Sequence, residues 1–307
     1  MLTSLLDNLS TSLSTKAFLQ MNYSLTKKMN LILACTLTLS FVLSYGQELE
    51  PLALAEKMFS TEGLPNAEAY TTKNYKGPLG LNLQKEVTTS FAVLEQKNTS
   101  AVVSMTLLDA SAEGIDAYLY FQKDSIWKVN AFRTLANMGM IQELKNSLET
   151  MSRKDVKSII KYYNSQNTED HYAMFTSMED YDYQLGNATL ILELDQTIAK
   201  HFLAHQDEFN RLKDLALKEF QEKAKPNQGK LKLIENLEAE YHNLFIASVS
   251  SGDYQLPGCI HFLIGGSLDN SVGYFYTANE ENVPSMSPSN FIMVKKIAEN
   301  WYMYKTT

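Results

Sequence analysis

Residues 87–132 alternate apolar and polar side chains in four short runs, and this pattern predicts four β-strands. One face of the four runs is apolar: Val87, Thr89, Phe91 and Val93; Val103, Met105 and Leu107; Ile115, Ala117, Leu119 and Phe121; Trp127, Val129 and Ala131. A period of two with one apolar face is typical of an antiparallel sheet that packs on one side. Turn-forming residues at 97–100, 110–114 and 123–125 separate the runs. The stretch therefore predicts a meander that needs a second layer over its apolar face.

The opposite face of this meander is not uniformly polar. Tyr118 and Tyr120 lie on it, next to Asp116 in the same run. A short helix over residues 51–59, with Pro51 at its first position, precedes the meander. The helical stretches before and after the meander are the nearest candidates for the layer over its apolar face, and Leu52, Leu54, Ala55 and Phe59 of this first helix could cover it.

After the meander, apolar residues recur at helical spacing and predict helices at 141–151 and 156–163. The longest predicted helix covers residues 196–223, with Asp195 as its N-cap. Its apolar stripe consists of Ile198, Phe202, Phe209, Leu212, Ala216 and Phe220. A break at 226–229 leads to a second stripe of Ile234, Leu237, Tyr241 and Leu244. Two helices joined in this way suggest an antiparallel helical hairpin.

Four further strands are predicted at 260–264, 272–277, 291–297 and 301–304. The predicted class is therefore α+β: an antiparallel meander with flanking helices, then a helical hairpin and a second antiparallel sheet. We divide the chain into residues 47–150 and 151–307, and the pattern leaves open whether the two halves share one core. Trp127 and Trp301 each follow a polar turn on a strand, so we expect them to anchor separate sheets.

The first 46 residues have the pattern of a signal peptide. Lys27 and Lys28 precede an apolar run at 31–43, and a small-x-small site ends at Gly46, so cleavage would leave Gln47 as the new N-terminus. The run is short for a membrane span of about 20 residues, although an uncleaved anchor is the alternative. A lipoprotein signal ending at Cys35 is a second alternative. Met21 is the better start, which makes residues 1–20 an over-extension.

Charge and cysteine content narrow the classes of function. The net charge is -8, and cleavage after residue 46 removes three lysines and one aspartate, which makes it -10. Such an acidic chain repels phosphates and is a poor partner for nucleic acid or anionic membranes. Cys259 is then the one remaining cysteine, so no intrachain disulfide forms and stability depends on the core.

His201 and His205 lie four residues apart on the predicted long helix, with Glu208 three residues further. Helical geometry places all three on one side, and a histidine pair at this spacing can hold a metal. Phe202 stands where the catalytic zinc motif needs Glu, and no third ligand is evident. We expect these histidines to be packing or surface residues, and we predict no metal and no cofactor.

Three other groups have weaker chemical signatures. Glu179, Asp180 and Asp182 lack the glycine and glutamate of a calcium loop, so they predict a solvated acidic loop. Residues 265–267 follow a strand as Gly-Gly-Ser, which predicts a turn rather than a nucleotide fingerprint. Cys259 and His261 share one face of a strand, a geometry that a Cys–His pair needs, although packing is the commoner reason. The chain contains no G-x-S-x-G or H-E-x-x-H motif.

The helix and the meander that ends in the Trp127 strand resemble the cystatin-like or nuclear-transport-factor-2-like fold over about residues 47–148. This resemblance implies a cone-shaped sheet, often with an apolar pocket, and the enzymes of that fold place Asp, His or Tyr in it. The leader is similar to Bacteroidota signal peptides, and residues 269–274 and 300–305 are similar to tails of uncharacterised secreted Bacteroidota proteins. These likenesses imply an exported protein and carry no activity.

Three functions stay open. The first is a periplasmic or extracellular non-enzymatic module of the cell envelope that binds an apolar ligand or a protein partner. The second is a hydrolase or isomerase with an unlocated pocket, and the third is a structural envelope component. A closed pocket with titratable groups favours the enzyme, and an open surface favours partner binding.

Overall fold

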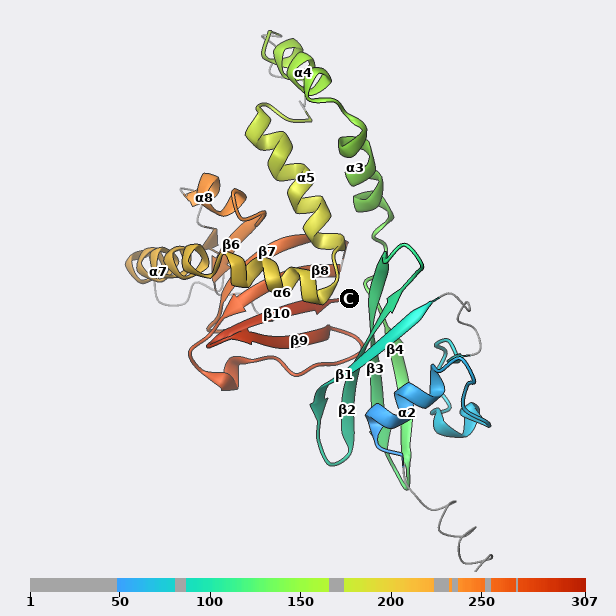
Figure 1. Ribbon diagram of the computed structural model, residues 1–307. Helices are drawn as coiled ribbons and strands as arrows, with labels where there is room; N and C mark the ends of the chain where they lie inside the picture. Colours follow the sequence, from blue (N-terminus) through green and yellow to red (C-terminus); the bar gives the residue numbers. More distant parts are fainter. Residues whose placement is uncertain are drawn as a thin grey trace, which may run out of the picture. The chain divides into compact units, whose positions relative to one another are not determined.

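The four predicted strands form one antiparallel sheet in the order β1-β2-β3-β4. They are β1 (Thr88–Gln96), β2 (Ser100–Leu108), β3 (Gly114–Lys123) and β4 (Trp127–Arg133). The computed structural model describes residues 49–80, 87–165, 174–223, 232–233, 237–251, 255–268 and 270–307. The predicted signal peptide, its cleavage site at Gly46 and Gln47, and Cys35 lie outside the described residues. The predicted meander is therefore confirmed, as the side-by-side strands in Figure 1 show.

Helix α2 (Pro51–Met58) covers the apolar face of this sheet and contacts β1, β2 and β4 (Figure 1). Its Leu54, Ala55 and Met58 are fully buried. The first turn begins at Pro51, whose fixed φ suits that position. The helix lies where the sequence predicts it, and it supplies the second layer that the apolar face requires.

A β-bulge alters the predicted faces of the last strand. The register between β3 and β4 shifts between Tyr120 and Phe121, so that Tyr120 pairs with Ala131 and Phe121 pairs with Val129. Because an extra residue in one strand reverses the alternation beyond it, Ala131 lies on the same face as Tyr120. The prediction that placed Ala131 with Trp127 and Val129 is wrong.

The helices after the meander differ from the prediction in three places. The first two are α3 (Gly139–Thr150) and α4 (Arg153–Ser165), close to their predicted bounds. Helix α5 (Met178–Leu192) was not predicted. The single long helix is two helices, α6 (Asp195–Ala204) and α7 (Gln206–Lys223), which meet at His205. Helix α8 (Glu238–His242) has only five residues, so the described chain does not form a hairpin of two long helices.

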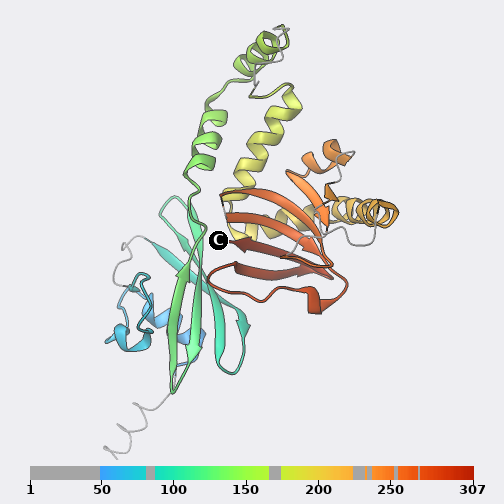
Figure 2. The same cartoon turned by 180° about the vertical axis from the view of Figure 1, so that it is seen from behind.

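The second sheet has the strand order β5-β6-β7-β8-β10-β9. Its strands are β5 (Lys232–Leu233), β6 (Ser248–Ser251), β7 (Ile260–Ser267), β8 (Asn270–Tyr276), β9 (Phe291–Ala298) and β10 (Trp301–Thr306). Each pair of neighbours is antiparallel, and the last four strands were predicted (Figure 2). The fold is therefore mixed α+β with two antiparallel sheets.

Residues 265–267 are the end of β7 and not the predicted turn. Gly265 pairs with Val272 and Gly266 pairs with Ser271 across to β8. A Cβ atom at Gly266 would lie 1.8 Å from the carbonyl oxygen of Asn270, so only glycine allows this close approach of the two strands. The turn follows at Leu268, whose φ is 54°.

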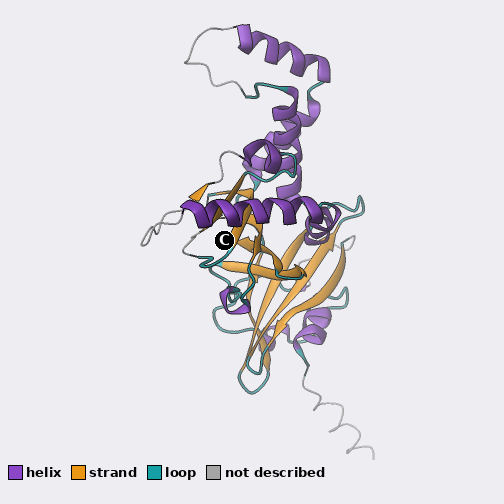
Figure 3. Cartoon of the chain, turned by 90° about the vertical axis from the view of Figure 1, so that its left-hand side faces the viewer, coloured by secondary structure: helices purple, strands orange, loops and turns teal. Residues whose placement is uncertain are grey.

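One hydrophobic cluster joins side chains of both sheets, which answers the question that the pattern left open. Val102, Tyr118, Tyr120 and Ala131 of the meander belong to the same cluster as Trp301 of the second sheet. The predicted stripe of α6 and α7 lies in it completely: Ile198, Phe202, Phe209, Leu212, Ala216 and Phe220. Figure 3 shows these helices, in purple, against the orange strands. Residues Glu50–Thr307 accordingly form one compact unit.

Candidate functional site

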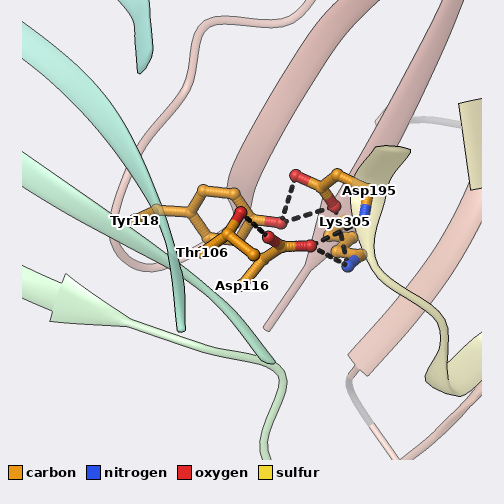
Figure 4. Close-up of polar contacts among 5 residues, drawn as sticks. All are labelled: Thr106, Asp116, Tyr118, Asp195 and Lys305. Carbon is orange, nitrogen blue, oxygen red and sulfur yellow. Dashed lines mark hydrogen bonds and ion pairs between the residues drawn. The ribbon is translucent and has the colours of Figure 1, made fainter. Parts of the chain in front are cut away.

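Five polar side chains from four separate elements meet on the face of the meander opposite α2 (Figure 4). Thr106 comes from β2, Asp116 and Tyr118 from β3, Asp195 from the start of α6, and Lys305 from the end of β10. We call these five residues the charged cluster. Asp116 and Tyr118 are two positions apart on one strand, so alternation directs both to the same face.

Asp116 and Asp195 are each held by neutral donors. The hydroxyl of Thr106 donates to Asp116 Oδ1 at 2.5 Å, and the backbone N–H of Asp195 donates to Asp116 Oδ2 at 2.6 Å. The hydroxyl of Tyr118 donates to both carboxylate oxygens of Asp195, at 2.9 and 3.0 Å. Lys305 Nζ lies 2.8 Å from Asp195 Oδ1 and 3.9 Å from Asp116 Oδ2.

The contact from Asp195 N–H to Asp116 also caps a helix. Leu194 is the N-cap residue of α6 and has no capping side chain, so Asp195 stands at the first helical position. Its backbone N–H has no partner within the helix, and a carboxylate there interacts favourably with the helix dipole. The predicted N-cap role of Asp195 is therefore wrong, because Asp116 of the neighbouring sheet supplies the acceptor and the Asp195 side chain turns inward.

The titratable side chains of the charged cluster are buried, and Thr106 is partly buried. The side chains of Asp116, Asp195 and Lys305 are 2%, 10% and 5% exposed, and Tyr118 is fully buried. Two carboxylates against one ammonium leave one negative charge unbalanced when both are ionised. Burial, and next the charge of Asp195, raise the pKa of Asp116, while Lys305 partly opposes this. Burial and the same carboxylates raise the pKa of the Tyr118 phenol well above its usual value, so it acts as a donor.

Two more tyrosines tie the elements together around the charged cluster. The hydroxyl of Tyr120 donates to the carbonyl oxygens of Phe291 and Ile292 at 3.2 and 3.0 Å. The hydroxyl of Tyr274 donates to the carbonyl of Ile198 at 2.8 Å. The prediction that Asp116, Tyr118 and Tyr120 lie opposite the apolar face is confirmed. The second half of the chain packs on this face, and all three side chains are buried there.

The two rings of the histidine pair have different hydrogen-bond and charge partners. The His201 and His205 rings are 4.9 Å apart, but His201 Nε2 donates to the Leu244 carbonyl at 3.0 Å. His205 Nδ1 lies 3.9 Å from Glu208, an ordinary helical neighbour. Burial lowers the pKa of His201, which favours its neutral form. Within the described ranges, no three His, Cys, Asp or Glu side chains are placed to hold a metal ion.

The acidic residues at 179–182 start helix α5, so the prediction of a loop is wrong there. Ser177 is the N-cap and accepts a hydrogen bond from the Asp180 N–H at 3.1 Å, while Asp180 accepts one from Thr176 N–H at 2.8 Å. Asp182 binds Arg153 of α4 through two nitrogen–oxygen contacts of 3.0 and 2.9 Å. The Ser-x-x-Asp spacing is a capping signal that would have identified this helix.

An open groove of about 980 Å³ lies between α5 and α8. Tyr183 and His242 stack inside it with ring centroids 3.9 Å apart. Four acidic side chains line it as well: Glu179, Asp180, Asp182 and Glu238. Burial lowers the pKa of His242, so this ring adds little positive charge. We call this feature the acidic groove.

Cys259 and His261 have separate surroundings. Cys259 precedes β7 and is buried, with its sulfur 3.7 Å from the Pro257 carbonyl and 3.8 Å from that of Asn282. His261 Nε2 is hydrogen-bonded to the hydroxyl of Tyr304. Cys259 thus lies just before the strand that carries His261.

The sequence missed Thr106, Asp195 and Lys305 as members of one cluster. No local signal joins them, because Lys305 follows Asp195 by 110 positions in the chain.

Over the part of the chain that the structure describes, no helix has the length and apolarity needed to cross a bilayer. The chain matches no protein-family model, and no curated protein and no solved structure is similar to it.

Proposed function

We propose that the protein is an exported, non-enzymatic module that binds a protein partner. The observation that carries this proposal is the burial of the charged cluster. Enzymes of the cystatin-like fold would use the inner face of the sheet for catalysis. Here Tyr118 and Asp116 on that face bind Asp195 of α6, and Asp116 lies 3.9 Å from Lys305 of β10. Both side chains thus have a structural task and no access for a substrate.

The acidic groove supports a polypeptide as the partner rather than an apolar ligand. It is open, and polar and charged residues contribute most of its lining, whereas pockets for small apolar ligands are mostly enclosed and apolar. The side chain of Glu238 is 61% exposed, and Glu179 is exposed as well. Their charge favours a segment that carries Lys or Arg. The stacked Tyr183–His242 pair offers a flat surface for an aliphatic stem or an Arg side chain.

The Arg153–Asp182 contact within the chain supports this mode of binding. The Arg153 guanidinium contacts Asp182 at the rim of the groove and lies 5.9 Å above the Tyr181 ring. A partner's cationic side chain would meet the same combination of carboxylate and aromatic ring at Glu238 and Tyr183. Charge complementarity of this kind mainly sets specificity and the rate of association.

The test is fluorescence anisotropy with a labelled lysine-rich peptide and a glutamate-rich peptide of equal length. We expect binding of the lysine peptide only, weakened by salt and at least fivefold weaker in the double variant E179Q/E238Q. The matched control is E56Q/E113Q, which removes two exposed acidic groups elsewhere and leaves binding unchanged. Equal binding of both peptides, or an unaffected E179Q/E238Q variant, would contradict the proposal.

One observation favours an enzyme instead, namely the raised pKa of Asp116 beside Lys305 and Tyr118. Perturbed carboxyl groups of this kind are frequent at active sites. Amide hydrogen exchange at Asp195, whose N–H binds Asp116, separates the two functions. A site that admits substrate exchanges this proton by local opening, whereas a closed cluster exchanges it only on global unfolding.

A further inference from the structure

The paired rings of Tyr183 and His242 form a flat surface in the acidic groove. Their centroids are 3.9 Å apart and their planes differ by 15°. Both side chains line the groove and both are partly exposed. Burial raises the pKa of Tyr183 to about 12 and lowers the pKa of His242, so the neutral form of each ring is favoured. A neutral aromatic surface of this kind attracts a cation to its face.

One carboxylate lies beside the ring pair and faces solvent. Glu238 Oε1 is 3.6 Å from His242 Nε2, and the Glu238 side chain is 61% exposed. The Asp180 carboxylate, in contrast, already accepts hydrogen bonds from the Thr176 N–H and the Gln184 amide, at 2.8 and 3.0 Å. A cation that stacks on the ring pair therefore meets the carboxylate of Glu238.

The turn after α8 fixes the position of the ring pair. Phe245 has a φ of 58°, in the left-handed region that a bulky residue rarely adopts. Its N–H donates to the His242 carbonyl at 2.9 Å, and its carbonyl accepts from the Asn187 amide of α5 at 2.7 Å. A Cβ atom at Gly186 would lie 2.2 Å from the Phe245 ring, so this glycine allows α5 and the turn to approach closely. The ring pair is thus held in place without a ligand, which lowers the cost of binding one.

Two ion pairs within the chain show how arginine and lysine differ. Arg153 meets Asp182 through two nitrogen–oxygen contacts of 3.0 and 2.9 Å and lies 5.9 Å from the Tyr181 ring. Lys296 meets Glu280 through one nitrogen–oxygen contact of 2.9 Å. A planar guanidinium stacks on a ring and donates two parallel hydrogen bonds to a carboxylate, whereas an ammonium acts as a point charge.

We propose that the acidic groove selects arginine over lysine, with the guanidinium stacked on the Tyr183–His242 pair and bound at its edge by Glu238. This inference rests on the proposed function, because it names the side chain through which the partner is recognised. Tyr183 is then a specificity-determining residue, since it supplies the ring surface. The carboxylates of the groove attract either cation and do not discriminate between them.

The experiment is fluorescence anisotropy with a labelled arginine-rich peptide and a lysine-rich peptide of equal length and charge. We expect the arginine peptide to bind about fivefold more tightly, the factor that an exposed cation–π contact contributes. The variant Y183L keeps an apolar side chain without the ring and should abolish the difference between the peptides, whereas Y183F keeps the ring and should retain it. The matched control is Y162L, which removes an exposed tyrosine of α4 and should leave both affinities unchanged. Circular dichroism checks that the variants are folded.

The outcomes separate this inference from the proposed function. Binding of neither peptide to the wild type overturns the proposed function and the arginine preference together. Equal binding of both peptides to the wild type overturns the arginine preference alone. A preference that persists in Y183L, or that disappears in Y183F, shows that the ring surface is not its source and contradicts the proposal. Loss of all binding in folded Y183L also contradicts it, because the ring would then be needed for either cation.

Discussion

Replacement of Lys305 by methionine tests the account of the charged cluster most directly. Methionine keeps most of the apolar stem and removes the ammonium that lies 2.8 Å from Asp195. Asp116 and Asp195 then lose the countercharge that they share. Removal of one partner from a buried ion pair usually costs about 3–5 kcal/mol, because it leaves an uncompensated buried charge.

A second estimate of the destabilisation by K305M, from the cost of protonating a carboxylate, gives the same magnitude. A buried carboxyl without a partner takes up a proton rather than remaining charged. From an ordinary Asp pKa of about 3.9, this costs about 1.4 kcal/mol for each pH unit, and hence about 4 kcal/mol at pH 7. At pH 5 the same step costs only about 1.5 kcal/mol. The destabilisation by K305M should therefore shrink by about 2–3 kcal/mol between pH 7 and pH 5.

Urea denaturation of the wild type and K305M at both pH values measures this difference. The control is K296M, since Lys296 forms an exposed pair with Glu280, and it should unfold like the wild type at both pH values. A K305M penalty that is the same at pH 5 and pH 7 would refute the reasoning, because it would show that no buried carboxyl depends on Lys305. A penalty below about 1 kcal/mol at pH 7 would show that the site admits water.

Four further outcomes are expected. The pKa of Asp116 is raised in the folded protein, so its contribution to stability is full below the unfolded pKa of about 3.9 and is lost as pH rises through the folded pKa. In a pH series of thermal melts, D116N should therefore lack this loss of stability. Truncation of Trp127 or Trp301 to Ala should cost about 3–5 kcal/mol in urea denaturation, because both are almost fully buried, and a variant that melts like the wild type would show an exposed ring. N-terminal mass spectrometry of exported protein should find Gln47 first, and a lipidated Cys35 would contradict this. Chelator should leave the melting temperature unchanged and metal analysis should find no stoichiometric transition metal, whereas a drop of several degrees would reopen the metal question.

The sequence predicts the meander and the final strands well because alternation is a local signal. It fails at the bulge after Tyr120, since an extra residue changes the faces without changing the residue types. Helix α5 was missed because Glu179 and Asp180 have the composition of a loop, although they are typical of a helix start.

The charged cluster could not be predicted from the sequence because its residues come from distant parts of the chain. Tyr118 could be placed on the inner face of the sheet from alternation alone. Its partner Asp195 looked like a helix cap, because an Asp before an apolar stripe usually has that role. Only the packed structure shows that Asp116 takes this role and frees the Asp195 side chain to bind Lys305.

The position of Lys305 along the chain has a consequence for biosynthesis. A ribosome adds Asp116 and Asp195 long before Lys305, so the growing chain holds two carboxylates whose countercharge does not yet exist. Domains usually fold as units while the chain emerges. Here α6 can cover part of the inner face of the first sheet early, but the β9 carbonyls that Tyr120 binds and the ammonium of Lys305 are made last. The nascent chain therefore cannot complete its core until the last strands are made.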